Sequence, residues 1–411
     1  MITSAAIRGA PVLKSFRLGT HRQFHPEETV ERALRVAPVI GITRVANVTG
    51  LDSIGLPVTM VTRPNARSLA VSQGKGVTVT AAKASGLMES IEAYHAETIT
   101  LPLRHCTYEE LRYAHAVVDV TELPFVESSI FDPNLKVLWC EGVDILNDEP
   151  MFVPYELVHT DYTWPHPAGT GSFVNSSNGL ASGNHILEAV SQGICEVIER
   201  DSVTLWHLRG PAEQDFLRVD VSTVDDPACR DVLEKFDRAG LGVLIWDATT
   251  DIGIASFVCV IFPREDDPLR PIAPAMGAGC HPSRAVALLR ALTEAAQSRL
   301  TQIAGSRDDV PRTLYQPSPE TLTMLRGQLE TSLVRSFHEV PDRNHDSLGE
   351  DVDWELERLS TVGIERVVVV DLTKEAFNIP VVRVVIPGLE GVHEVPGYVP
   401  GKRVRALLAA S

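Results

Sequence analysis

The sequence predicts an α+β fold with largely antiparallel sheets, and three observations support this. Short runs rich in Val, Ile, Phe and Trp are typical of strands. Helical patterns interrupt these runs without the regular strand–helix alternation of a parallel sheet. The composition, 44% hydrophobic and 22% charged over 411 residues, is that of an ordinary globular protein. We therefore expect helices packed on antiparallel sheets around an apolar core.

The elements follow from the local patterns, and no internal repeat stands out. Segment 78–84 leads into the first helix. The predicted helices are 81–97, one within 177–200, 283–300, a surface helix flanked by loops within 305–350, and 352–363. The predicted strands are 117–123, 136–146, 151–160, 242–249, 254–262, 271–280, 366–373 and 381–388.

The segment SNGLASGNHILEAVSQGICEVIER, residues 177–200, is the most informative part of the chain. At about 100° per residue, four of its polar side chains fall within an arc of roughly 120°. They are Asn184, Glu188, Glu196 and Glu199. Ile, Leu and Val side chains fill the opposite face. The plain interpretation is a solvated acidic face, although like charges at this spacing destabilise a helix unless a cation lies between them.

Two further predicted helices carry charged side chains at helical spacing. In residues 81–97, Ser85, Glu89 and Glu92 form one polar stripe. In residues 283–300, Arg290 and Glu294 stand one turn apart among Ala and Leu. An exposed Arg–Glu pair would explain the third helix, since such pairs contribute a few tenths of a kcal/mol. It would not explain why the most Ala- and Leu-rich helix keeps several polar side chains together.

Carboxylates from two helices and an Arg from a third are suited to a magnesium–phosphate site. Mg²⁺ takes oxygen ligands and shares them with waters and phosphates. A guanidinium holds phosphate oxygens with two parallel hydrogen bonds. A bound cation would also turn a repulsive cluster of Glu side chains into a stable one.

These motifs resemble the YcaO family. The resemblance rests on SNGLASGN followed by ExxxQxxxExxER, on Ser85-xxx-Glu89-xx-Glu92, and on ALTEAAQSRL followed by the Arg307-Asp308-Asp309 turn. It covers the chain from about Lys14 to Arg405, with the motifs in family order. It implies a YcaO-type fold that binds ATP without a Walker or kinase loop. It also implies one catalytic domain over 1–411, with an N-terminal segment 1–60 and a YcaO core 61–405.

The resemblance also implies which residues hold the cofactors ATP and Mg²⁺. Lys75 lies in the GKG segment before the first acidic helix, and Lys14 matches the family's N-terminal lysine. The implied ATP residues are Lys14, Lys75, Ser85, Glu89, Asn184, Glu188, Arg200, Arg290 and Glu294. The implied Mg²⁺ residues are Glu89, Glu92, Glu188, Glu196 and Glu199. No general base is identified.

Charge and motif content exclude other classes. A net charge of −17 argues against nucleic acid as a partner, because phosphate-backbone binding needs a cationic surface. No apolar run is long enough for a membrane span, and the first residues lack the apolar core of a secretory signal. We therefore expect a cytoplasmic protein without a membrane partner. The six cysteines form no CxxC pair, so no zinc or redox motif is visible.

The family resemblance implies that a backbone amide of a ribosomally made precursor peptide is activated by O-phosphorylation. A side-chain nucleophile would then give an azoline, an amine an amidine or macroamidine, and a sulfide source a thioamide. The chain ends PGYVPGKRVRALLAAS, without the Pro-rich tail of azoline-forming members that work with a separate partner. It is therefore more similar to the stand-alone or TfuA-associated type. We expect cyclodehydration, with thioamide formation beside a TfuA-like partner as the alternative.

Two other classes stay open. One is a non-catalytic nucleotide-binding adaptor, which would be expected to lack one or more of the acidic residues. The other is an ATP-dependent ligase that acylates an amine. A homo-oligomeric assembly is compatible with all of these classes.

Overall fold

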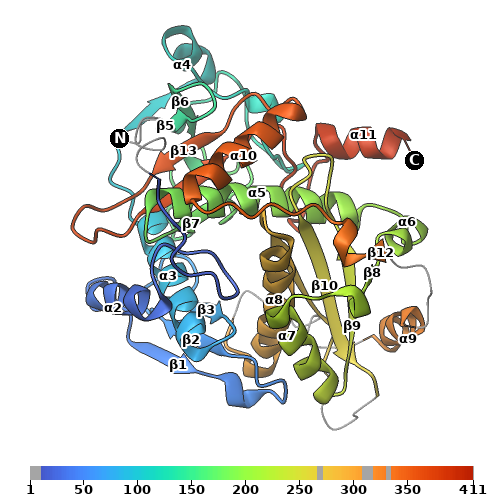
Figure 1. Ribbon diagram of the computed structural model, residues 1–411. Helices are drawn as coiled ribbons and strands as arrows, with labels where there is room; N and C mark the ends of the chain where they lie inside the picture. Colours follow the sequence, from blue (N-terminus) through green and yellow to red (C-terminus); the bar gives the residue numbers. More distant parts are fainter. Residues whose placement is uncertain (1–10, 266–271, 308–317, 330–334, 411) are drawn as a thin grey trace.

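The computed structural model describes residues 11–265, 272–307, 318–329 and 335–410, and Figure 1 shows their arrangement. The fold is α+β, as predicted. The strands of all three larger sheets pair antiparallel. The short pair of β8 (Val219–Asp220) and β12 (Arg335–Ser336) is parallel.

The first layer is a three-stranded sheet with a long helix on it. Strands β1 (Arg44–Asn47), β2 (Val58–Thr62) and β3 (Val71–Lys75) pair in sequence order. Helix α3 (Val79–Glu97) packs on β3, and α2 (Pro26–Val36) packs on α3. The predicted helix 81–97 is therefore confirmed. The sheet itself was not predicted. The end of the N-terminal segment 1–60 lies within β2, and the single catalytic domain over 1–411 stays a prediction.

A second sheet has the same plan. Strands β9 (Leu241–Asp247), β10 (Ser256–Pro263) and β11 (Ala275–Cys280) form it, and α8 (Arg284–Ala304) lies on β11. Gly277 permits this close approach, because a Cβ there would collide with the backbone nitrogen of Ala295 on α8. Helix α7 (Pro227–Arg238) packs on α8 and β9. The three predicted strands and the predicted helix 283–300 are present.

The largest sheet has six strands. Its order is β4 (Leu103–Cys106), β5 (Val137–Asp144), β13 (Val368–Asp371), β14 (Val381–Val385) and β7 (Leu180–Ser182), and β6 (Glu149–Pro154) also pairs with β5. Helix α5 (Ile186–His207) runs between this sheet and the two smaller ones (Figure 1). Helix α10 (Leu348–Thr361), the predicted helix 352–363, covers α5.

The remaining helices are peripheral: α4 (Tyr108–Ala114), α6 (Pro211–Phe216), α9 (Pro319–Gln328) and α11 (Lys402–Ala410). Helix α9 is the predicted surface helix. The predicted strand 117–123 is wrong: Val120–Glu122 is a 3₁₀ turn capped by Asp119, whose side chain accepts the N–H of Thr121. No helix in the described ranges is long and apolar enough to span a membrane.

Candidate active site

A cavity of about 1120 Å³ lies among α3, α5 and α8. These are the three helices on which the sequence placed its charged patterns. Ten of the predicted site residues line this cavity: Lys75, Ser85, Glu89, Glu92, Glu188, Glu196, Glu199, Arg200, Arg290 and Glu294. Residues more than 200 positions apart in the chain therefore meet at one site.

Helix α3 supplies two carboxylates that are held by backbone donors. Glu92 Oε1 accepts the backbone N–H of Ser182 at 2.8 Å and its hydroxyl at 2.7 Å. Glu89 Oε1 accepts the backbone N–H of Gln73 on β3 at 3.4 Å. The remaining lone pairs of both groups are available to a cation, because a carboxylate offers about four acceptor sites.

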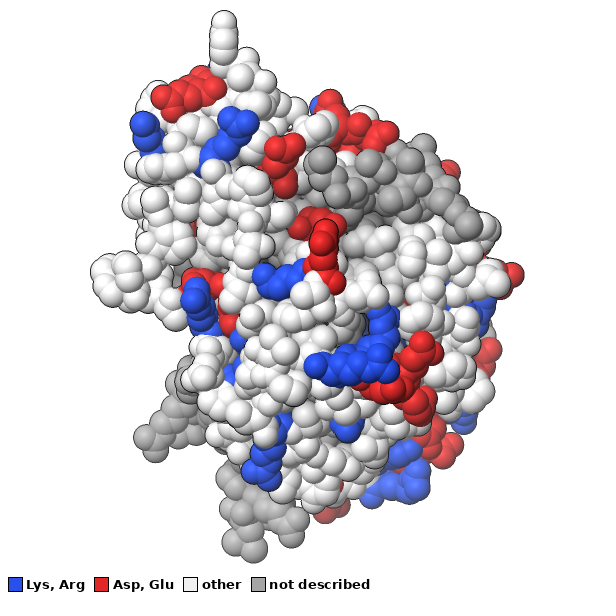
Figure 2. All heavy atoms as spheres, turned by 90° about the vertical axis from the view of Figure 1, so that its left-hand side faces the viewer, with Lys and Arg blue, Asp and Glu red and all other residues white. Residues whose placement is uncertain are grey.

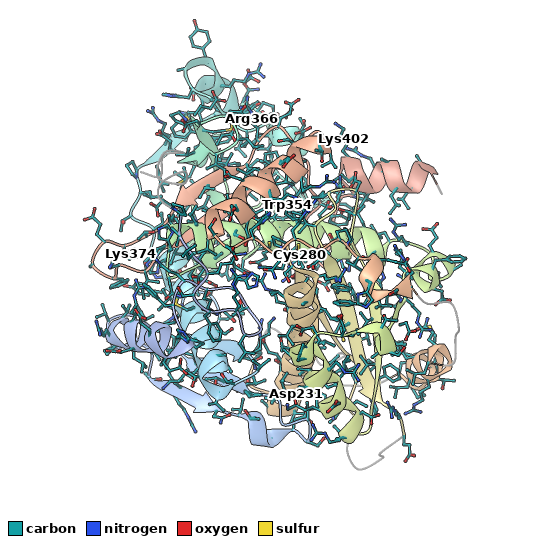
Figure 3. All side chains as sticks on the ribbon, viewed as in Figure 1. Asp231, Cys280, Trp354, Arg366, Lys374 and Lys402 are labelled. Atoms are coloured by element: carbon teal, nitrogen blue, oxygen red, sulfur yellow. The ribbon has the colours of Figure 1, made fainter. Side chains whose placement is uncertain are left out.

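Helix α5 supplies three more carboxylates, those of Glu188, Glu196 and Glu199. Glu188 is 9% and Glu199 8% exposed, so the alternative of a solvated acidic face is wrong. Glu188 Oε2 accepts the backbone N–H of Gln23 at 3.1 Å, and its other oxygen lies 3.9 Å from Arg22 Nη1. Glu199 Oε2 accepts the N–H of Cys280 at 3.1 Å. Cys280, labelled in Figure 3, ends β11, the strand that packs against both α5 and α8.

Three cations face these carboxylates. Lys75 forms an ion pair with Glu294, joining the end of β3 to α8. Arg200 Nη2 lies 3.8 Å from Glu199 Oε1. Arg290 donates to the carbonyl oxygen of Cys280 at 2.9 Å. Glu294 therefore pairs across the cavity with Lys75, and the alternative of an exposed Arg290–Glu294 pair is wrong.

The pKa values of the cavity carboxylates show the effect of burying them together. Burial raises the pKa of Glu89 to about 7 and that of Glu196 to about 7. Burial, together with repulsion from Glu89 and Glu196, raises the pKa of Glu92 to about 8. Burial would also raise the pKa of Glu294, but Lys75 and Arg200 hold it below its usual range. Burial therefore disfavours the ionised form of the carboxylates on α3 and α5.

This donor set fits Mg²⁺. A hard dication takes carboxylate oxygens readily, and its charge would remove the repulsion that raises these pKa values. Glu89, Glu92, Glu188, Glu196 and Glu199 are the residues that would hold it. Arg290, Arg200 and Lys75 would hold phosphate oxygens.

Two predicted ATP residues do not line this cavity. Asn184 faces α2, where its side-chain oxygen accepts from Thr29 at 3.1 Å, while its amide donates to Glu188 Oε1 at 3.3 Å. Lys14 is fully buried, with Nζ 2.6 Å from Asp351 Oδ2. Their roles at ATP stay predictions. Arg307 lines the cavity, whereas Asp308 and Asp309 lie outside the described residues.

Several cavity residues were missed. Ser182 and Gln73 place the α3 carboxylates, and His21, His281 and Asp351 line another wall. Ser182 lies in the quoted SNGLASGN motif, so that motif was an available signal. Nothing local in the sequence brings residues 21, 281 and 351 together.

Comparison with known proteins assigns the chain to a protein family. A sequence model of the YcaO cyclodehydratases, described as binding ATP and Mg²⁺, matches residues 73–390. The chain belongs to the YcaO family. This YcaO protein is accordingly an ATP- and Mg²⁺-dependent enzyme, and the family's work is modification of peptide backbones.

Relatives of this YcaO protein cover most of its length. A Rhizobium leguminosarum bv. trifolii protein, described by its place in the tfuA 3′ region, is 39% identical over 359 residues, 85% of this chain and 84% of its own. A Methanothermobacter thermautotrophicus protein of unspecified function is 36% identical over 395 residues, 93% of this chain and 98% of its own.

Solved structures show the same fold. YcaO from Methanopyrus kandleri, bound with AMPPCP and Mg²⁺, gives a TM-score of 0.72 at 23% identity and covers 95% of this chain and 99% of that one. A heterocyclase in complex with substrate and cofactor gives 0.76 at 23% identity and covers 93% of this chain. The YcaO protein spans only 54% of that heterocyclase.

Proposed function

We propose that this enzyme activates a backbone amide of a ribosomally made precursor peptide by phosphorylating its oxygen with ATP, and that a nucleophile then closes an azoline or amidine ring. The observation that carries the proposal is the cavity of about 1120 Å³ in which five carboxylates from α3 and α5 face the cations Lys75, Arg200 and Arg290. An amide oxygen is a poor leaving group and phosphate a good one. The ATP supplies the phosphoryl group that makes this exchange.

Each wall of the cavity has a role in this proposal. The α3 and α5 carboxylates would hold Mg²⁺, whose charge would be available to phosphate oxygens. Arg290, fixed by its bond to the Cys280 carbonyl, presents a planar fork to the transferred phosphoryl group. Charge that develops on that group is thereby met by cations already in place, which is the main source of catalysis in phosphoryl transfer.

The complete set of acidic residues in one cavity supports an enzyme over a non-catalytic adaptor. The face drawn in Figure 2 also gives no support for a basic groove that would bind nucleic acid. On the face drawn in Figure 2, Lys and Arg lie singly or beside Asp and Glu and form no continuous basic field. An ATP-dependent ligase that acylates an amine stays the alternative enzyme. Such a ligase would leave the backbone amides of the peptide unchanged.

Thioamide formation with a TfuA-like partner is the second candidate. The relative from the tfuA 3′ region of Rhizobium leguminosarum bv. trifolii favours it, since it is 39% identical over 359 residues. Both candidates share the activation step and differ only in the nucleophile.

The test is a reaction of the protein with a short peptide encoded beside its gene, ATP and Mg²⁺. We expect peptide-dependent release of phosphate and ADP, and loss of one water from the peptide by mass spectrometry. Exchange of one oxygen for sulfur, when a TfuA-like protein and sulfide are added, would select the second candidate. A stable phosphopeptide, a new amide to an added amine, or ATP turnover that ignores the peptide would contradict both.

A further inference from the structure

A second polar cluster lines the cavity, away from the carboxylates. It consists of His21 in the N-terminal segment, His281 after β11 and Asp351 on α10, all of which line the cavity. The two imidazole rings stand edge to face with centroids 4.9 Å apart. One ligand atom from each of the three side chains lies within 4.8 Å of the others. His21 precedes the residues matched by the family model, 73–390.

The carboxylate of this cluster is already neutralised. Lys14 Nζ lies 2.6 Å from Asp351 Oδ2, and His345 Nδ1 lies 3.1 Å from Asp351 Oδ1. The two His and one Asp could otherwise be ligands of a zinc ion. A dication here would stand beside the buried ammonium of Lys14 on the same carboxylate. The neighbours of Asp351 therefore favour proton transfer over metal binding.

Both rings are held neutral. His21 is 9% and His281 4% exposed. Burial, followed by Lys14, Arg17 and Arg290, lowers the pKa of His21 to about 3. Burial, Arg290, His21 and Lys14 lower the pKa of His281 well below its usual value. Asp351 is the carboxylate that faces the pair, and it is engaged by Lys14 and His345.

The two rings differ in which nitrogen is free. His281 Nδ1 accepts the backbone N–H of Ser283 at 2.9 Å, so the neutral ring carries its proton on Nε2 and is a donor there. Within the described part of the chain, His21 Nδ1 is buried without a hydrogen-bond partner. Its tautomer is not fixed by such a bond. Of the pair, His21 is the ring that can offer a lone pair.

The pair also lies near Arg290, to which the proposed function assigns the phosphate contact. Arg290 donates to the carbonyl of Cys280, the residue before His281. On the other side, Gln23 and Arg22, which follow His21, contact Glu188. Burial is the largest cause of the lowered pKa of His21 and Arg290 the smallest, so a triphosphate at Arg290 would raise that pKa only in part.

We propose that His21 is the general base that takes the proton of the attacking nucleophile, and that His281 is a positioning residue for it. The inference rests on the proposed function, in which every candidate nucleophile is a thiol, hydroxyl, amine or hydrosulfide. The γ-phosphoryl group first passes to the amide oxygen while the bond from γ-phosphorus to the bridging oxygen breaks and ADP leaves. As the nucleophile then forms its bond to the amide carbon, its proton passes to His21. The bond from that carbon to the phosphorylated oxygen breaks, phosphate leaves, and the former amide nitrogen gives up its proton. The proton on His21 then returns to solvent.

His21→Gln tests this step, with His25→Gln as the matched control. His25 lies four residues away, is exposed, and does not line the cavity. With the peptide substrate, we expect His21→Gln to lower kcat by about 10²–10⁴-fold, while the affinity for ATP with Mg²⁺ stays within about twofold by calorimetry. The control should keep wild-type kcat. A His21→Gln variant that is folded and within about fivefold of wild-type kcat overturns the proposal.

Two further measurements separate a base from a structural histidine. Imidazole added to His21→Ala should restore part of kcat, and the restored rate should rise with the pKa of the substituted imidazole that is added. His281→Gln should lower kcat less than His21→Gln does, without rescue by imidazole. Lack of rescue in folded His21→Ala overturns the proposal, as does Co²⁺ absorption of a tetrahedral site that disappears in His21→Gln. A wild-type protein without peptide-dependent turnover would instead overturn the proposed function.

Discussion

At the scale of single residues, the cavity depends on carboxylates such as Glu89 and Glu199, whose pKa values are raised by burial. Glu89 and Glu199 each accept a hydrogen bond from one backbone N–H. This bond fixes the orientation of each carboxylate in the cavity. Glu89→Gln or Glu199→Gln should weaken binding of ATP with Mg²⁺ by about 1–3 kcal/mol, because one charged ligand is lost. Calorimetry measures this directly. Glu357→Gln on the exposed side of α10 is the control, and wild-type affinity in both folded site variants would refute the assignment.

Arg290 tests the phosphate contact. Lys at this position keeps the charge but loses the planar fork and the bond to the Cys280 carbonyl. We expect turnover of Arg290→Lys to fall at least tenfold, which corresponds to about 1.4 kcal/mol in the barrier. Steady-state rates of phosphate release in the presence of the peptide measure this difference between Arg290→Lys and the wild type. Full turnover would mean that the guanidinium geometry is not used.

At the scale of elements, the contact of β11 with α8 sets the position of Arg290 and Glu294. A Cβ at Gly277 would meet the backbone of Ala295, whereas one at Gly327 on α9 would meet nothing within 4 Å. We expect Gly277→Ala to lower the free energy of unfolding by about 1–3 kcal/mol and also to weaken nucleotide binding. Gly327→Ala should leave both unchanged or slightly improved. Urea titration and calorimetry check the pair, and equal behaviour of the two variants would show that the helix shifts freely.

The elements also show how far the sequence could be interpreted. Glu188, Glu196 and Glu199 belong to one continuous helix, so helical spacing correctly put them on one side. Asn184 lies before the helix, whose N-cap is His185, and helical spacing does not apply to it. Its side chain points to α2 instead. The sheet of residues 44–75 was missed because its three strands have four or five residues each and no strong alternation.

Contacts between distant segments could not be predicted from local patterns. Lys14 with Asp351, and His21 with His281, join the N-terminal segment to residues far along the chain. Such pairs depend on how sheets and helices are stacked, and periodicity carries no information about stacking. The family resemblance placed the cavity residues on α3, α5 and α8, whereas it pointed to Lys14 without placing it.

At the scale of the whole molecule, the acidic cavity links protons, Mg²⁺ and stability. The pKa values of about 7 for Glu89, 8 for Glu92 and 7 for Glu196 lie above the ordinary 4.5. The folded state therefore binds more protons than the unfolded state between these values. Without Mg²⁺, stability should fall as pH rises through this interval.

Mg²⁺ reverses that trend, because it binds the ionised carboxylates and releases their protons. The rise in Tm caused by Mg²⁺ should be larger at about pH 8.5 than at about pH 5.5. Thermal melts with and without Mg²⁺ at both pH values measure it. Glu92→Gln should reduce the difference. An increase in Tm that is equal at both pH values would contradict the proton linkage.

The ion pair between Lys75 and Glu294 joins residues separated by 219 positions, and the cavity closes only when α3, α5 and α8 are all in place. Contacts of such sequence separation form late, because long loops must close first. Nucleotide binding should therefore be among the last properties gained during refolding. Since no single segment carries the complete cavity, an isolated N-terminal or C-terminal half of the chain should not bind ATP.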